Sequence, residues 1–172
     1  QMFPIGSKKY PQRLKDIAQP PYAIFCKGSM PDARKSVGIV GARMCSEYGR
    51  SIATKLGKML AGKDVQVISG MALGIDSASH AGALQGKGST FAVLGCGCDI
   101  CYPKNARNLY ENIQTSGGGI LSEYPPGTEP LPYRFPERNR IISALSDSLV
   151  VVEAKKRSGS LITADAALEQ GK

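Results

Sequence analysis

The chain has 172 residues, of which 42% are hydrophobic and 21% charged, and this length and composition suit one folded domain with its own core. Lysine and arginine number 22 against 14 aspartates and glutamates, so the formal net charge is +8, a balance that favours polyanionic partners such as nucleic acid. The apolar fraction excludes a disordered basic tail, and the 20 glycines and 11 prolines follow neither a collagen triplet nor a low-complexity block.

Targeting and redox features favour the cytoplasm. Apolar runs such as residues 148–152 are far shorter than the roughly 20 residues of a membrane-spanning helix, and residues 1–10 lack the pattern of a signal peptide. Five cysteines is an odd number, which is a poor basis for a disulfide framework. We therefore expect a cytoplasmic protein with reduced thiols and no membrane association.

The first part of the chain is rich in proline. Residues 1–32 contain prolines at positions 4, 11, 20, 21 and 31, and one short piece of helical period at residues 13–18. We interpret residues 1–35 as an N-terminal segment packed on the core, and residues 36–172 as the domain proper.

From residue 36 onward, short β-branched runs alternate with stretches of helical period. The pattern predicts strands at residues 36–40, 65–69, 90–94, 120–122 and 148–152, and helices at residues 47–61, 75–85, 105–113, 138–146 and 161–170. This alternation predicts an α/β fold with a doubly wound, mostly parallel sheet and helices on both faces. Ligands of such sheets bind outside the carboxyl ends of the strands, so the loops there are where a site is expected.

The first two strand-end loops have the residues of an anion site. Gly41 lets a ligand approach the backbone, Arg43 supplies a fork for phosphate, and Ser46 can cap the following helix. The dinucleotide fingerprint is absent because Arg43 and Ser46 stand where glycines are needed; a surface ion pair is the alternative for Arg43. The second loop, residues 70–76, is again glycine-rich and opens a helix, with Asp76 as a candidate cap.

Histidine and cysteine do not indicate catalysis or metal binding. His80 is the only histidine, and a lone helical histidine is more often a packed structural residue than a catalytic one. Cys96, Cys98 and Cys101 lack a fourth ligand for zinc, so we interpret them as small residues in a tight, ligand-facing turn. We expect neither a metal nor a cofactor.

Two further segments are basic. Residues 133–140 interleave three arginines with Tyr133 and Phe135, a mixture that serves single-stranded nucleic acid through phosphate contacts and base stacking. Residues 155–157 are Lys-Lys-Arg, followed by a small-residue turn that starts a helix and also suits phosphate. The alternative for this triplet is an exposed, solvated charged run.

Five motifs together resemble the DNA processing protein A (DprA or Smf) family over nearly the whole chain. They are residues 41–49 (GARMCSEYG), 69–76 (SGMALGID) with His80, 95–97 (GCG) with Tyr102-Pro103, 135–143 (FPERNRIIS) and 158–164 (SGSLITA). The resemblance implies an extended Rossmann-like domain that binds single-stranded DNA without cleaving it. It further implies a protein that protects incoming strands in natural transformation, helps to load the recombinase RecA, and forms a homodimer at full length.

By position, the resemblance assigns DNA binding to Arg43, Ser46, Gly70, Met71, Arg134, Asn139, Arg140 and Lys155, with no catalytic residue. Leu73 stands where many relatives have a lysine or arginine, which puts one contact in doubt. The chain stops at Lys172, where relatives continue into another strand. We therefore expect a truncated core whose exposed strand edge and apolar helix face make it monomeric or prone to aggregate.

Two enzyme classes are the alternatives. Related Rossmann-like phosphoribohydrolases also bind phosphate on strand-end loops, but they have a Pro-Gly-Gly-x-Gly-Thr turn with a catalytic glutamate, where this chain has Ser158–Thr163. A dinucleotide-dependent oxidoreductase is disfavoured by the absent fingerprint, and by Ser69 and Gly70 at the end of the second strand, where an acidic residue is needed.

Overall fold

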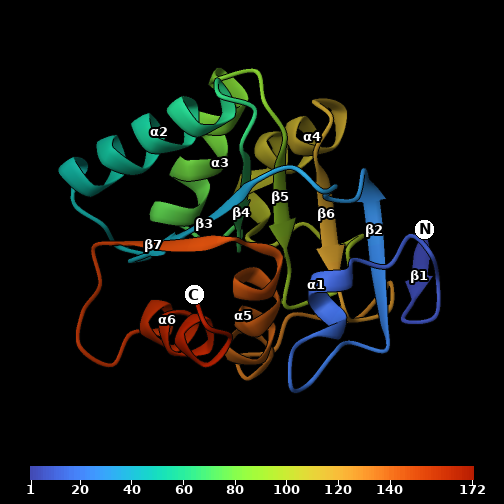
Figure 1. The fold of residues 1–172 in the computed structure, drawn as a ribbon. Coiled ribbons are helices and arrows are strands. Elements are labelled where there is room, and N and C mark those ends of the chain that lie inside the picture. Colours follow the sequence, from blue (N-terminus) through green and yellow to red (C-terminus); the bar gives the residue numbers. More distant parts are fainter.

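A computed structural model describes all 172 residues, and Figure 1 shows one sheet with helices on either side. In chain order the elements are β1 (Met2–Pro4), α1 (Gln12–Lys15), β2 (Ala23–Gly28), β3 (Ser36–Gly41), α2 (Glu47–Ala61), β4 (Gln66–Ser69), α3 (Ile75–Gln85), β5 (Thr90–Val93), the 3-10 turn η1 (Lys104–Ala106), α4 (Arg107–Thr115), β6 (Gly119–Ser122), α5 (Arg134–Leu145), β7 (Ser148–Val152) and α6 (Gly159–Glu169). None of the helices is both long and apolar enough to cross a bilayer.

The seven strands form a single sheet in the order β1-β2-β6-β5-β4-β3-β7. The five strands from β6 to β7 pair in parallel, while β2 pairs antiparallel with β6 and β1 antiparallel with β2. The chain winds from β3 outward to β6, and then returns through α5 to place β7 on the other side of β3. This arrangement confirms the predicted doubly wound, mostly parallel α/β fold.

Alternation along the central strands builds a core on each face of the sheet. Ile39 and Val67 pack with residues of α2 and α3, whereas their neighbours Val40 and Ile68 pack with residues of α1 and α5. Successive side chains of a strand point to opposite faces, so one apolar run supplies both cores. Figure 1 shows the same division, with α2, α3 and α4 on one face and α1, α5 and α6 on the other.

The N-terminal segment contributes two strands that the sequence analysis did not predict. Phe25 of β2 lies opposite Ser122 of β6, and Phe3 of β1 lies opposite Ile24. The side chain of Leu14 in α1 is fully buried in the same core. The prolines that frame these short strands obscured them, because an edge strand depends on its partner and not on local periodicity. The division at residue 35 stays a prediction.

Two helices begin earlier than predicted. Helix α5 begins at Arg134, which places Pro136 in its first turn. Proline is tolerated there because the missing N–H costs no intrahelical hydrogen bond. Helix α6 begins at Gly159. The switch of direction between β3 and β7 sends α2 to one face of the sheet and α6 to the other, which opens a crevice at the carboxyl ends of these strands.

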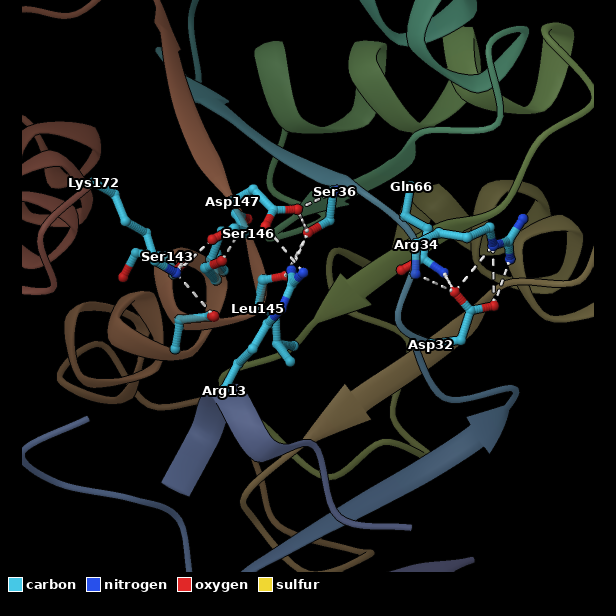
Figure 2. A network of polar contacts seen from close by, with 12 residues as sticks. Arg13, Asp32, Arg34, Ser36, Gln66, Ser143, Leu145, Ser146, Asp147 and Lys172 are labelled. Atoms are coloured by element: carbon cyan, nitrogen blue, oxygen red, sulfur yellow. Dashed lines mark hydrogen bonds and ion pairs between the residues drawn. The ribbon is translucent and has the colours of Figure 1, made fainter. Parts of the chain in front are cut away.

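Polar side chains join the segments at the opposite, amino-terminal edge of β3, β4 and β7 (Figure 2). Arg13 donates to Ser36 Oγ (2.6 Å), the Leu145 carbonyl (3.1 Å) and Asp147 (3.0 Å), and Asp147 also accepts the Ser36 N–H (2.8 Å). The Lys172 ammonium donates to carbonyls at the end of α5, those of Ser143 and Ala144 and of the following residue Ser146. We call these groups, with the Asp32, Arg34 and Gln66 cluster beside them, the polar network.

Candidate functional site

A cavity of about 390 Å³ lies at the carboxyl ends of the parallel strands. Its walls come from the β3–α2 loop and from the first turns of α3 and α6, together with one face of α5. The lining includes Arg43, Asp76, Arg138, Asn139 and Ser160. We call it the strand-end cavity; it lies where the fold class predicts a ligand site.

Arg43 stands at the mouth of this cavity. Its side chain is exposed and has no carboxylate within 4.0 Å, so the alternative of a surface ion pair is wrong. Its guanidinium lies 5.6 Å from the centre of the Phe135 ring, a cation–π distance. Arg43 therefore has hydrogen-bond donors free for an anion.

Phe135 is the centre of an aromatic cluster beside Arg43. Its ring centre is 5.4 Å from that of Tyr102 and 6.0 Å from the guanidinium of Arg138. The ring lies against the end of β5, where a Cβ on Gly95 would come within 2.9 Å of it. Tyr102 is 42% exposed, so part of this aromatic cluster is accessible from solvent.

Ser46 is engaged within the protein. Its Oγ accepts the Gly49 N–H (3.0 Å), which caps α2, and donates to Glu153 (2.7 Å). The same carboxylate accepts the Ser46 N–H at 3.0 Å. The N-terminus of α2 thus already has an internal anion, and the predicted phosphate contact at Ser46 requires Glu153 to move.

Gly70 and Met71 support the cavity but do not present side chains to it. Met71 is completely buried in an apolar cluster, so its predicted contact with DNA is wrong for the side chain. The Gly70 carbonyl accepts from Arg138 (2.9 Å), and its N–H donates to Asp76 (3.1 Å). A Cβ at residue 70 would lie 2.7 Å from both side chains, so a glycine is needed there.

Asp76 and Arg138 form the inner wall of the strand-end cavity, at 6% and 3% exposure. Burial raises the pKa of Asp76 to about 6, although Arg138 and the N–H groups of Ala72 and Gly70 oppose the shift. Burial also lowers the pKa of Arg138 to about 10, which leaves it charged at neutral pH.

Neighbouring residues of α5 point to different sides of the helix. Asn139 lines the strand-end cavity and donates to the Gly159 carbonyl (3.1 Å). Arg140, about 200° around the axis from Arg138, forms a two-pronged ion pair with Glu123 at 2.7 Å and donates to the Gln19 carbonyl. It lines a larger cavity of about 570 Å³ between α1, α5 and α6, so its predicted place among the strand-end contacts is wrong.

Arg134 and Lys155 flank the strand-end cavity in sequence without lining it. The guanidinium of Arg134 donates to the Glu129 carbonyl and lies 5.0 Å from the ring centre of Tyr124 and 5.5 Å from that of Tyr133. Lys155 is exposed in the β7–α6 loop, and its ammonium has no partner in the protein. Both cations are accessible from solvent.

The histidine and the clustered cysteines are structural. His80 is fully buried, its Nδ1 lies 2.7 Å from Thr90 Oγ1, and burial lowers its pKa to about 3, so the ring is neutral. Cys96, Cys98 and Cys101 are buried in the core with free thiols, and burial raises the pKa of Cys96 to about 11. They do not face a ligand as predicted, and no group of three His, Cys, Asp or Glu side chains is arranged to hold a metal ion.

Arg138 is the residue that the sequence analysis left out of the site. It was part of the basic aromatic segment but was not singled out. Its signal is helical period: Arg138 precedes Ile141 and Ile142 by three and four residues, and both isoleucines are buried. An arginine on the apolar face of a helix is desolvated, which distinguishes it from Arg140.

Comparisons with known proteins agree with this architecture. A family model described as DNA recombination-mediator protein A matches residues 1–172. The DNA processing protein DprA of Bacillus subtilis is 44% identical over 172 residues, which are 99% of this chain and 58% of that protein. The chain thus spans just under three fifths of the length of this curated relative.

Two solved structures are also similar. The X-ray structure of DNA processing protein A from Streptococcus pneumoniae superposes with a TM-score of 0.90 at 41% identity, covering all of this chain and 60% of that one. A structure of DNA processing protein A from Helicobacter pylori, described as giving insight into its single-stranded DNA binding mode, has a TM-score of 0.82 at 31% identity. It covers 94% of this chain and 74% of the other.

Proposed function

This chain belongs to the DNA recombination-mediator protein A family, and from this premise we propose that it binds single-stranded DNA across the carboxyl ends of its parallel strands. The observation that supports the proposal most strongly is the set of unpaired cations in the strand-end cavity and in the loops that follow the strands. Arg43, Arg138 and Lys155 have no carboxylate within 4.0 Å, whereas Arg13, Arg34 and Arg140 are paired. Unpaired cations beside the half-buried Phe135 and the exposed Tyr102 suit a flexible polyanion with accessible bases.

The proposed binding has an electrostatic and a stacking component. Arg43 and Lys155 contact phosphates, with Arg134 extending the basic rim, and each contact releases counterions from the strand. Phe135 and Tyr102 offer ring faces to the bases, and every base has a face to stack. Binding of this kind favours single strands over duplex, because paired bases are not available for stacking.

We propose binding without catalysis. The carboxyl group that lines the strand-end cavity, Asp76, is buried and accepts the Gly70 and Ala72 N–H groups. Glu153 is held by Ser46. These contacts use both acids structurally, whereas the phosphoribohydrolase alternative requires an acid free to act on a nucleotide. Release of free base from a nucleoside monophosphate is the result that would favour that alternative.

Family membership also supports the wider role. We propose that the whole protein protects incoming strands in natural transformation, helps to load the recombinase RecA and acts as a homodimer. Helix α6 exposes the apolar side chains of Ile162 (44%) and Leu168 (72%), and both are accessible to a second subunit. Sedimentation of this chain tests self-association, and a strand-exchange assay with RecA tests loading.

The first experiment is fluorescence anisotropy of a labelled oligo-dT strand titrated with this chain, with unlabelled duplex and a nucleoside monophosphate as competitors. We expect binding that duplex competes for poorly. Arg43→Ala weakens it by about 1–2 kcal/mol, because a charge-assisted phosphate contact is lost. Lys63→Ala is the matched control, because it removes an exposed charge before β4, at the amino-terminal ends of the parallel strands. We expect this variant to change affinity less than twofold. Equal loss in both variants contradicts the proposed surface.

A further inference from the structure

The inner wall of the strand-end cavity contains a buried cation with no carboxylate in ion-pair contact. Arg138 is 3% exposed, and its Nε donates to Asn139 while Nη1 donates to the carbonyls of Gly70 and Val93. Its Nη2 has no partner in the protein, and no carboxylate lies within 4.0 Å of the guanidinium. Burying a charge is costly, and the charge of Asp76 on the same wall offsets this cost without direct contact, so the open Nη2 position favours an anion from outside.

The first turn of α6 faces the same space. Gly159 and Ser160 line the cavity, and their N–H groups donate to no acceptor in the protein. Ser158 Oγ bonds to Ser160 Oγ instead of capping the helix, and the first turn has no acidic residue. Helix α2 differs, since Glu153 occupies its N-terminus. The positive end of the α6 dipole is therefore free for an anion.

We propose that the strand-end cavity binds a phosphate monoester, either the terminal phosphate of a DNA strand or the phosphate of a mononucleotide. Arg138 and the first N–H groups of α6 hold the phosphate oxygens, and Arg43 stands at the mouth. For a strand end, the inference rests on the proposed function and adds to it a preference for phosphorylated ends.

Depth and charge favour a terminal over an internal phosphate. Arg43 is exposed while Arg138 is almost fully buried, so a group that reaches Arg138 must project beyond the rest of its ligand. A terminal phosphate projects in this way, whereas an internal one is tethered on both sides. A monoester also has a charge of about −1.5 to −2 at neutral pH, which benefits more from the guanidinium and helix dipole.

Asp76 lines the cavity too and opposes an anion when it is ionised. Its carboxyl already accepts two backbone N–H groups, and burial favours its neutral form. An entering phosphate shifts Asp76 further toward that neutral form, since a neighbouring negative charge disfavours a second one. The carboxyl is therefore compatible with the site.

The test compares 5′-phosphoryl and 5′-hydroxyl oligo-dT of one length by anisotropy, with dTMP and inorganic phosphate as competitors. Arg138→Met is unsuitable because it leaves the Gly70 and Val93 carbonyls without a donor. Gly159→Asp places a carboxylate at the first residue of α6, where a Cβ meets nothing within 4 Å and an acid suits the helix. Gly6→Asp, in an equally open and exposed turn, is the matched control.

We expect the 5′-phosphoryl strand to bind about tenfold more tightly, as one added charge-assisted contact implies. That ratio falls toward one in Gly159→Asp and persists in Gly6→Asp. Competition by dTMP and phosphate, with both strands binding alike, also supports the monoester site and assigns a mononucleotide as its source. Equal strand affinities without competition overturn the inference. If the proposed function itself is wrong, the result is different, because neither the 5′-phosphoryl nor the 5′-hydroxyl strand binds.

Discussion

The two ends of the parallel strands use the same residue types in opposite ways. At the amino-terminal edge, the polar network surrounds each cation with acceptors: Arg13 has Asp147 and two oxygens, and Lys172 has three carbonyls (Figure 2). At the carboxyl edge, Arg43 and Arg138 have aromatic and backbone neighbours but no carboxylate within 4.0 Å. We infer from this difference that the pairing of a cation, more than its identity, separates a structural arginine from one that is available to a ligand.

The pKa values of the carboxyl groups also differ between the two regions. Burial opposes ionisation of Asp147, but hydrogen bonds from Ser36 and the charge of Arg13 outweigh it and lower the pKa of this carboxyl. Burial prevails at Asp76 and raises its pKa to about 6. The polar network therefore favours the charged form of its carboxyl group, whereas burial in the strand-end cavity makes the charged form of Asp76 less favourable.

The largest expected effect is loss of stability from the polar network. Asp147→Ala leaves the Ser36 N–H and Arg13 without their acceptor, and we expect the free energy of unfolding to fall by about 2–4 kcal/mol. Urea denaturation followed by circular dichroism measures it. Affinity for oligo-dT, per folded molecule, stays the same. A variant that keeps its stability but loses DNA binding would reverse the roles assigned to the two edges.

The contribution of Asp76 to stability should fall as pH rises, the opposite of what the lowered pKa of Asp147 implies. The folded-state pKa of Asp76, about 6, exceeds the ordinary 3.8, so the native state binds more protons between these values and stability falls as pH rises through them. Asp76→Asn removes this loss. The unfolding free energy of the variant relative to the parent should therefore rise by about 2 kcal/mol from pH 4 to pH 7. Urea melts across this range measure it, and a flat difference contradicts a buried, disfavoured carboxylate.

Stacking gives a smaller effect that leaves electrostatics untouched. Phe135→Leu removes the ring beside Arg43 and Tyr102, and we expect oligo-dT affinity to fall by about 1 kcal/mol. The dependence of affinity on salt should not change, because no cation is lost. A salt titration of the variant checks both points, and a shallower salt dependence with unchanged affinity would show that the ring positions Arg43 and does not contact bases.

The smallest effect is expected from an exposed pair outside both regions. Glu111 accepts from Arg107 one turn earlier on α4, and both side chains are more than half exposed. Glu111→Ala should change the unfolding free energy by less than about 0.5 kcal/mol. Comparison with Asp147→Ala under identical denaturation conditions then shows how much more unfolding free energy an ion pair contributes inside the polar network than on an exposed helix. Similar losses in the two variants would remove the distinction.

Much of this architecture follows from local sequence pattern. The strand at residues 148–152 and the helices at residues 47–61 and 75–85 agree with the predicted bounds, because a β-branched run marks the strand and helical stretches bounded by glycine or serine mark the helices. The strands β1 and β2 were missed because their pairing is tertiary. Knowledge of the fold class located the strand-end cavity. It did not distinguish Arg138 from Arg140; that distinction needs the helical period, which places Arg138 on the same face as the buried Ile141 and Ile142.

The pairing of cations also lay beyond the sequence. Glu123 and Arg140 are 17 residues apart, and Glu153 reaches Ser46 across 107 residues, so no local signal announces either contact. Met71 illustrates the same limit: it follows a strand-end glycine, as a ligand contact would, yet the backbone turns its side chain into the core. Residue type predicted the chemistry of the loops, but burial and pairing decide which of the loop side chains are accessible to a ligand.

The central claim is that unpaired cations at the carboxyl edge bind DNA and paired ones do not. Its most direct test is the slope of log affinity against log salt for oligo-dT, measured for the parent chain, Arg43→Gln and Arg140→Gln. We expect Arg43→Gln to make the slope shallower by about 0.7, the value for one neutralised phosphate, and Arg140→Gln to leave it unchanged. An unchanged slope in Arg43→Gln, or an equal reduction in both variants, contradicts the account.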